Sequence, residues 1–163
     1  MSLRTGPSAP RKLAASLRTG PDAWAAWLIK SSSLPAEIDP GWAPGEEREL
    51  DRCVRRSYRL ELVSPGQPVV LWVSGRVDPG VHAVGTVAGS VRDGGDDGGP
   101  VLPVRLTRLS DPVDRGELLA DPGFGSAEVV RMPAGSNPSW LSAAQLGAVL
   151  ARAGLDRLGR WVP

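Results

Sequence analysis

The chain has 163 residues, with 19 Lys and Arg against 18 Asp and Glu, so its net charge is +1. This length suits one domain with a real core. The balance of charge excludes a broad cationic surface for non-specific binding of nucleic acid or membrane. Cys53, the only cysteine, cannot form a disulfide or a multi-thiolate metal site within the chain. No apolar run is long enough to span a membrane or act as a secretion signal, so we expect a cytoplasmic protein.

The first 22 residues form a segment of their own. They are rich in Ser, Pro, Gly, Arg and Ala, show no hydrophobic periodicity, and contain the string SLRTGP twice. This composition predicts a disordered N-terminal tail, residues 1–22, followed by one folded domain, residues 23–163.

Five apolar segments of the domain read as strands. The first, WAAWLIK, is apolar throughout and predicts a strand buried on both faces. The second and third are joined by a short connection containing DPG, which indicates a hairpin. The predicted strands are residues 24–30, 69–75, 81–89, 101–109 and 126–132.

Two segments read as helices. Residues 46–59 begin with glutamates and end with arginines, which complements a helix dipole, and the pattern places Cys53 on the buried face. The second helix begins at Ser142, with Gln145 completing a capping box, Leu141 and Leu146 forming a hydrophobic staple, and a glycine at position 154 ending it. Residues 111–125 read as an irregular or short helical connector. Together, the predicted strands and helices indicate an α+β fold with a small mixed sheet or barrel.

Catalytic signatures are few. His82 is the only histidine and falls inside a predicted strand, so an ordinary strand histidine is favoured over a Ser/His/Asp arrangement. No phosphate loop, dinucleotide fingerprint or metal-ligand spacing occurs. We therefore expect no catalytic residue, no cofactor and no metal.

Tryptophan supplies most of the aromatic surface, with six Trp beside one Tyr and one Phe. Trp42 lies in a Pro- and Gly-rich loop that reads as exposed, and Trp140 directly precedes the capped helix. Core packing is the alternative for either indole alone. Together with nearby hydroxyl and amide groups, however, two loop indoles predict a site for a flat, hydrogen-bonding ligand such as a nucleobase.

Several strings in order along the chain resemble a known family. WLIKSSS, then GW, then GEERELDRCVRRSYR and VVLWVSGRVDPGVHAVGTV resemble the EVE domain of the PUA-like superfamily and its relative, the YTH domain. LPVRL, ELLADPGF and VVRMPAGSNPSWLSAAQLGAVL extend the resemblance to about residue 154. It implies a PUA-like small mixed β-barrel of about five to six strands flanked by helices. It also implies binding of modified bases, methylated adenine in RNA for YTH domains and modified cytosine or adenine in DNA for EVE domains.

The resemblance also implies a ligand site at the end of the first strand, with Trp42 as the first cage tryptophan. The alternative is that Lys30 and the serines after it only solvate the strand end. The chain reads KSSS where EVE domains usually read Lys-Ser-Glu-Pro, and its closing loop also differs, so the resemblance does not identify the base. The implied ligand-binding residues are Lys30, Ser31, Ser32, Trp42, Ser74, Gly75, Asn137 and Trp140.

Four of the arginines in the segment after Trp42 are candidates for contacts with the nucleic-acid backbone. Arginine forks suit phosphate oxygens, although compensation of a helix dipole explains the same residues equally well. They are Arg52, Arg55, Arg56 and Arg59.

We expect a monomeric, non-enzymatic binder of nucleic acid that carries a modified base, with DNA favoured over RNA. One alternative is a PUA-like RNA-processing enzyme, resembling a ribonuclease, that uses Lys30 with a serine or His82. The other is a protein-interaction module that binds its partner through exposed indoles.

Overall fold

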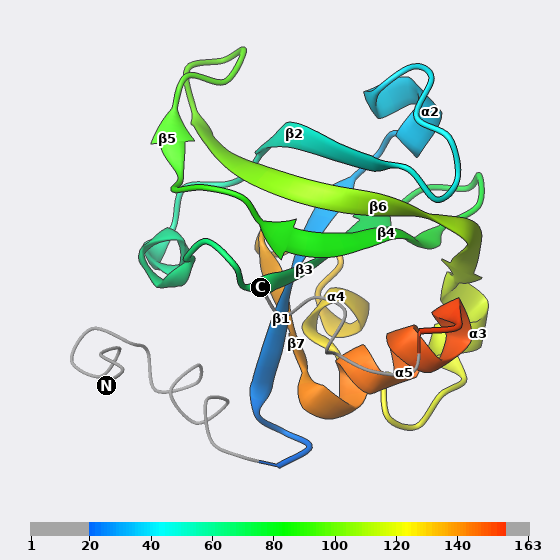
Figure 1. Ribbon diagram of the computed structural model, residues 1–163. Helices are drawn as coiled ribbons and strands as arrows, with labels where there is room; N and C mark the ends of the chain where they lie inside the picture. The colour runs from blue at the N-terminus through cyan, green and yellow to red at the C-terminus, as the bar shows by residue number, and fades with distance from the viewer. Residues whose placement is uncertain (1–19, 156–163) are drawn as a thin grey trace.

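The computed structural model describes residues 20–155, so the predicted tail lies outside them except for its last three residues. The described chain forms one mixed sheet of seven strands, with short helices beside it (Figure 1). The strands are β1 (Trp24–Ser31), β2 (Glu47–Cys53), β3 (Pro68–Val73), β4 (Gly80–Val87), β5 (Arg92–Asp93), β6 (Pro100–Asp114) and β7 (Ser139–Ser142). The helices are α2 (Pro35–Ile38), α3 (Arg115–Leu119), α4 (Glu128–Arg131), α5 (Ala143–Ala153) and the 3₁₀ helix η1 (Tyr58–Leu62).

The strand order is β2-β6-β4-β3-β1-β7, with β5 paired to β6. β1 runs parallel to β3, and every other described pairing is antiparallel. The α+β class with a mixed sheet is therefore confirmed.

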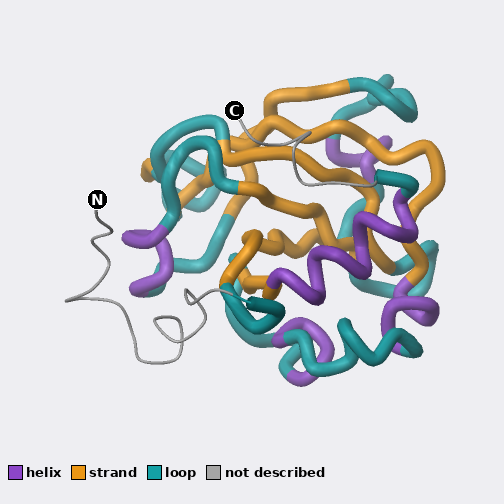
Figure 2. The backbone as a smooth tube through the Cα atoms, turned by 60° about the horizontal axis from the view of Figure 1, so that its bottom comes forward, coloured by secondary structure: helices purple, strands orange, loops and turns teal. Residues whose placement is uncertain are grey.

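The continuous apolar run of β1 is explained by burial on both sides of the sheet. Ala26 and Leu28 belong to one core cluster, which they share with apolar side chains of α3, α4 and α5. Trp27 and Ile29 point the opposite way, into a second cluster. Side chains alternate along a strand, so a strand covered on both faces carries no polar alternation. Figure 2 shows α5 lying along one face of the strands.

The second cluster shows that the sheet rolls up. It joins Ile29 of β1 with Leu71 of β3 and Leu106 of β6, and Leu50 of the edge strand β2 packs against it. Strands from both ends of the sheet order thus bury side chains in one interior, which is compatible with a barrel-like shape although the hydrogen-bonded sheet itself is open.

Helix α5 forms as its local signals predict. The Ser142 hydroxyl accepts from the Gln145 N–H at 3.2 Å, and the Gln145 side chain accepts from the Ser142 N–H at 2.8 Å. Leu141 and Leu146 are both fully buried in the first cluster, as a hydrophobic staple requires. Gly154 ends the helix in the left-handed conformation, with φ of 80°.

The helix predicted over residues 46–59 is wrong. This segment contains the strand β2, which pairs antiparallel with β6 so that Leu50 lies opposite Val104, and then the 3₁₀ helix η1. Side chains alternate between exposed and half-buried along β2, a period of two that the charged sequence conceals. Cys53 is consequently exposed, not buried on a helix face.

The strand predicted over residues 126–132 is also wrong, since Glu128–Arg131 form the one-turn helix α4. A short apolar run does not distinguish a strand from a buried helical turn. The connector prediction holds in part: β6 extends to Asp114, and α3 follows as a short helix. Across residues 20–155 no helix is long and apolar enough to cross a membrane.

Candidate functional site

The polar residues at the end of β1 lie beside the end of β2, the end of β3 and residues 133–137. The Ser31 hydroxyl both donates to the Ser33 carbonyl and accepts from the Ser33 N–H, each at 2.9 Å, which turns the chain out of the strand. The Ser31 carbonyl accepts from the Ser74 N–H at 2.9 Å, so the end of β3 is fixed beside it. Ser31 itself is 6% exposed. Part of the polar run therefore has a structural role, as the solvation alternative proposed.

Three cations surround this strand end. Lys30 Nζ donates to the Pro133 carbonyl at 3.0 Å, and Arg55 Nη1 donates to the Gly135 carbonyl at 3.1 Å. Arg52 Nη2 lies 3.4 Å from the Ser31 hydroxyl. Within the described residues none of the three forms an ion pair with a carboxylate. We name Lys30, Ser31, Arg52, Arg55 and Asn137 the β1-end cluster.

Partial burial makes the charged forms of Lys30 and Arg52 less favourable than they are in water. Desolvation lowers the pKa of Lys30; Glu128 acts in the opposite direction, and the neighbouring Arg55 and Arg59 lower that pKa further. Desolvation likewise lowers the pKa of Arg52, whose Nε is buried without a hydrogen-bond partner in the described structure. Buried donors of this kind are stabilised by an added acceptor, and an anion stabilises them most.

Asn137, which lies two residues before the edge strand β7, joins the ends of β1 and β2. Its side-chain oxygen accepts from the Lys30 N–H of β1 at 3.1 Å, and its amide donates to the Cys53 carbonyl of β2 at 3.5 Å. Its own carbonyl accepts from the Arg55 N–H at 2.6 Å. The end of edge strand β2 is thereby fixed to the segment leading into the other edge strand, β7. The Asn137 side chain is thus engaged within the protein.

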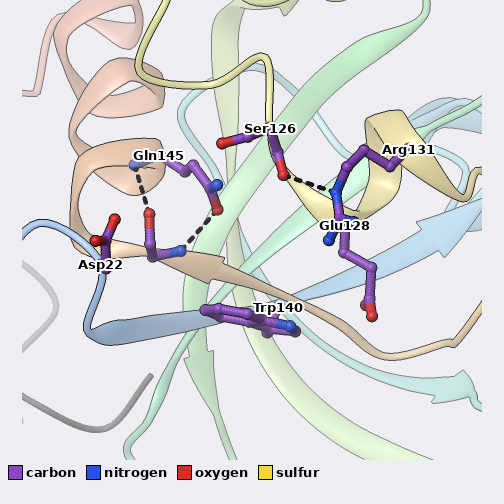
Figure 3. Close-up of a pocket in the computed structure, with 7 residues that line it drawn as sticks. Asp22, Ser126, Glu128, Arg131, Trp140 and Gln145 are labelled. Atoms are coloured by element: carbon purple, nitrogen blue, oxygen red, sulfur yellow. Dashed lines mark hydrogen bonds between the residues drawn. The ribbon is translucent and has the colours of Figure 1, made fainter. Parts of the chain in front are cut away.

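A pocket of about 270 Å³ opens beside β7. Figure 3 shows the Trp140 ring along one wall, with residues of the first turn of α5 and of α4 on opposite sides. Trp140 is half-buried, and Arg131 donates from Nε to the Ser126 carbonyl at 3.1 Å, which fixes its side chain toward the pocket rim. The lining residues of this Trp140 pocket are Asp22, Ser126, Glu128, Arg131, Trp140, Ser142 and Gln145.

A buried ion pair lies between the pocket and η1. Arg59 donates to both carboxylate oxygens of Glu128, at 2.7 and 2.6 Å, and the Ser139 hydroxyl donates to the same carboxylate at 2.6 Å. Arg59 also donates to the Pro138 carbonyl at 3.2 Å. The hydrogen bonds that Arg59 donates to Glu128 raise the pKa of Arg59 above its ordinary value. This pair joins η1, α4 and β7 into one rigid support.

Hydrogen bonds join six predicted site residues at the end of β1. Ser74 is exposed there, together with Ser32 and Gly75 on the adjoining turns. Trp140 lies three residues after Asn137, facing the pocket. The six residues are Lys30, Ser31, Ser74, Asn137, Arg52 and Arg55.

Two predicted site residues need correction. Trp42 is 1% exposed in the second core cluster and donates its indole N–H to the Glu46 carbonyl at 2.8 Å, so its faces cannot stack on a ligand. The rolled sheet encloses the indole because burying its apolar area is favourable. Arg59 is 4% exposed and held by Glu128, so it is not free to bind phosphate. Arg56 forms an exposed ion pair with Asp93 at 2.6 Å, and its contact with phosphate stays a prediction.

The sequence interpretation missed most of the residues that line the pocket. Glu128 and Arg131 were placed in a strand, and Gln145 was assigned only to the helix cap, where its side-chain oxygen does bind. A lone acidic residue within the apolar string AEVVRM was the available signal for Glu128, because a buried charge requires a partner.

The remaining candidates for chemistry have ordinary environments. His82 is 5% exposed within β4, with Nε2 at 2.6 Å from the Asp78 carbonyl, as expected of a strand histidine. Among residues 20–155 no group of three or more His, Cys, Asp or Glu side chains could hold a metal ion.

The fold and this site define an α+β protein with a rolled mixed sheet and a cationic, indole-bearing site beside one edge strand. No family model matches the chain, and no curated protein matches it. A hypothetical protein from Leishmania major is similar in structure, with a TM-score of 0.63 and 17% identity over 83% of this chain and 98% of that one. A protein from Agrobacterium tumefaciens has a TM-score of 0.62 and 15% identity over 85% and 98% of the two chains.

Human THYN1, solved in complex with DNA containing 5-methylcytosine, has a TM-score of 0.49 and 15% identity over 79% of this chain and 97% of its own. This likeness is too weak to transfer the DNA ligand to this chain. The similarities to the Leishmania and Agrobacterium proteins show that the whole described fold recurs in proteins of very different sequence.

Proposed function

We propose that this protein binds nucleic acid without catalysing a reaction, with a modified base in the Trp140 pocket and a phosphate on the β1-end cluster. The observation that carries this proposal is the group of three cations, Lys30, Arg52 and Arg55, that form no ion pair with a carboxylate in the described structure and lie next to an indole-walled pocket.

The cluster supplies what a phosphate requires. Arg52 has a buried, unpartnered Nε, and the ammonium of Lys30 is partly desolvated. A phosphate oxygen accepts charge-assisted hydrogen bonds from the ammonium of Lys30 and from the terminal guanidinium nitrogens of Arg52, and compensates their lost hydration. With a net charge of +1, the protein has little other electrostatic attraction for nucleic acid, so these contacts dominate the salt dependence of binding.

The pocket supplies what a base requires. Its volume of about 270 Å³ lies below the range typical of drug-sized ligands, which suits a single base. Trp140 provides a stacking face worth about 1–3 kcal/mol per base, while Ser126, Arg131 and Gln145 offer polar atoms for its edge. The resemblance to EVE domains supports a modified base. Burying one added methyl contributes about 0.8 kcal/mol, about four-fold in Kd.

The two subsites lie within reach of one nucleotide chain. Asn137 of the cluster and Trp140 of the pocket are three residues apart, so their backbones are separated by at most about 11 Å. The protein can therefore contact phosphate and base of the same short strand.

The test measures binding of fluorescently labelled single-stranded oligonucleotides by anisotropy. The set carries 5-methylcytosine, N6-methyladenine or neither, and is titrated over a range of salt. We expect one modified base to bind about four-fold more tightly than its unmodified form. Trp140→Ala should weaken binding by about 1–3 kcal/mol, and Trp140→Phe should retain part of the affinity because it keeps an aromatic face.

The phosphate half has its own readout. Arg52→Gln and Arg55→Gln should each reduce the slope of log K against log salt by about 0.7. The control is Arg105→Gln, an exposed arginine of β6 paired with Glu49, which should leave the slope unchanged. If Trp140→Ala, Arg52→Gln and Arg55→Gln all leave the affinity and its salt dependence unchanged, the site is refuted. Loss of intact oligonucleotide on a denaturing gel refutes the non-enzymatic part.

A further inference from the structure

Tyr58 is the most exposed of the aromatic side chains in the described chain, at 46%. The other described aromatics are half-buried or buried in the two core clusters. An exposed ring without contacts is ordinary, but the ring of Tyr58 has a partner that holds it. Arg59 lies over the ring, its guanidinium carbon 5.8 Å from the ring centroid, and its Nε is 3.4 Å from the tyrosine hydroxyl.

The partner that holds the ring is itself rigid. Arg59 is 4% exposed and is fixed by two hydrogen bonds to Glu128 and one to the Pro138 carbonyl. Tyr58 is therefore oriented by a buried ion pair before any ligand arrives, which reduces the entropy lost when something binds to it. Arg59 lies over the ring, and 46% of the surface of Tyr58 remains exposed.

The segment that carries the ring also runs beside the β1-end cluster. The segment from Arg55 to Arg59 runs along residues 137 and 138, through the hydrogen bonds from the Arg55 N–H to the Asn137 carbonyl, 2.6 Å, and from Arg59 to the Pro138 carbonyl. Tyr58 is three residues from Arg55, so their backbones are at most about 11 Å apart. The ring is also tied to the Trp140 pocket, because Arg59, which lies over it, pairs with Glu128 of the pocket lining.

We propose that Tyr58 is a stacking platform for an unpaired base next to the one that enters the Trp140 pocket, so that the ligand is a single-stranded stretch rather than an isolated nucleotide. This inference rests on the proposed function and extends its site to Tyr58 at the start of η1. A base has a π-face whatever its sequence, so the platform adds affinity without adding sequence preference. In a paired duplex the same base is stacked on its neighbours and is not available to the ring.

The experiment compares two ligands on four proteins. The ligands are the 5′-mononucleotide of the preferred base and a trinucleotide with that base in the centre. The proteins are wild type, Tyr58→Ala, Tyr58→Phe and Leu119→Ala. Leu119 is the matched control because it is 47% exposed but lies on α3, on the helical side of the sheet.

We expect Tyr58→Ala to weaken trinucleotide binding by about five-fold or more and to change mononucleotide binding by less than about two-fold. Tyr58→Phe keeps the ring and should bind both ligands as wild type does, as should Leu119→Ala. A Tyr58→Ala protein that loses the same factor for both ligands, or for neither, overturns the platform while leaving the proposed function intact. Wild type that binds neither ligand overturns both proposals.

Discussion

Removal of the Glu128 carboxylate should destabilise the protein more than any other single change at the site. Glu128→Ala leaves Arg59, which is 4% exposed, as a buried cation without its carboxylate, and it removes the acceptor of the Ser139 hydroxyl. Breaking a buried pair in this way costs about 3–5 kcal/mol, because the remaining charge is desolvated and uncompensated. A small domain has only about 5–15 kcal/mol of stability in total, so the loss is large.

The measurement is urea-induced unfolding followed by tryptophan fluorescence, which gives the free energy of unfolding and its m value. The matched control is Asp93→Ala, which removes an ion pair to Arg56 of similar length, 2.6 Å, but with side chains 66% and 68% exposed. We expect no measurable change there, since exposed pairs contribute little. An unchanged m value in Glu128→Ala shows that stability changed and not the surface exposed by unfolding.

A second variant tests the reasoning itself. Replacing both partners, Arg59→Met with Glu128→Leu, removes the pair without leaving a buried charge, so it should recover most of the loss. If Glu128→Ala costs less than about 1 kcal/mol, or if the double variant is no better than the single one, the assignment of Arg59 as a desolvated, Glu128-dependent cation is refuted.

Three further predictions concern single residues. Ser142→Ala removes the cap of α5 and should lower the free energy of unfolding by about 0.5–2 kcal/mol, whereas Ser142→Asp should retain most of it; equal losses in urea unfolding would contradict the capping role. Asp121 has a pKa lowered by the Gly123 N–H and by Arg152, so its stabilising contribution is present above the ordinary pKa of the group and is lost as the pH falls through the lowered value. Asp121→Asn should therefore flatten the acid side of a plot of melting temperature against pH, and a steeper acid side would refute this. Lys30 has a pKa lowered by desolvation, so its charge opposes folding at neutral pH and stability rises as the pH passes through that lowered value. Lys30→Met should leave the urea midpoint unchanged or higher while weakening oligonucleotide binding and reducing its salt slope, and a lower midpoint with unchanged binding would contradict the phosphate role.

The elements that the sequence predicted correctly are those whose signals are local. The capping box at Ser142 and Gln145 involves residues three positions apart, and the glycine at position 154 takes the left-handed conformation that ends a helix. The apolar run of β1 likewise predicted a strand buried on both faces. In each case the determining contacts are made within a few residues, or by burial that composition already reveals.

The site itself was predictable only in part. The sequence indicated the strand end at Lys30 and Ser31, the amide of Asn137 and the indole of Trp140, and the structure joins Lys30 to Asn137 by a hydrogen bond. It could not reveal that Trp42 is enclosed, because the rolled sheet that covers this loop residue is built from strands distant in the chain.

Tertiary structure decided the rest for one physical reason, which is that partners far apart in sequence outweigh local preference. Residues 47–53 carry helix-like charges yet form β2, because pairing with β6 satisfies their backbone groups and buries Leu50. Arg59 and Glu128 are 69 positions apart, and each is tolerable in the interior only because the fold places the other beside it. The sequence by itself thus determined the strand, the capped helix and the polar groups available to a site. Only the fold decided which of those groups face a ligand and which support the core.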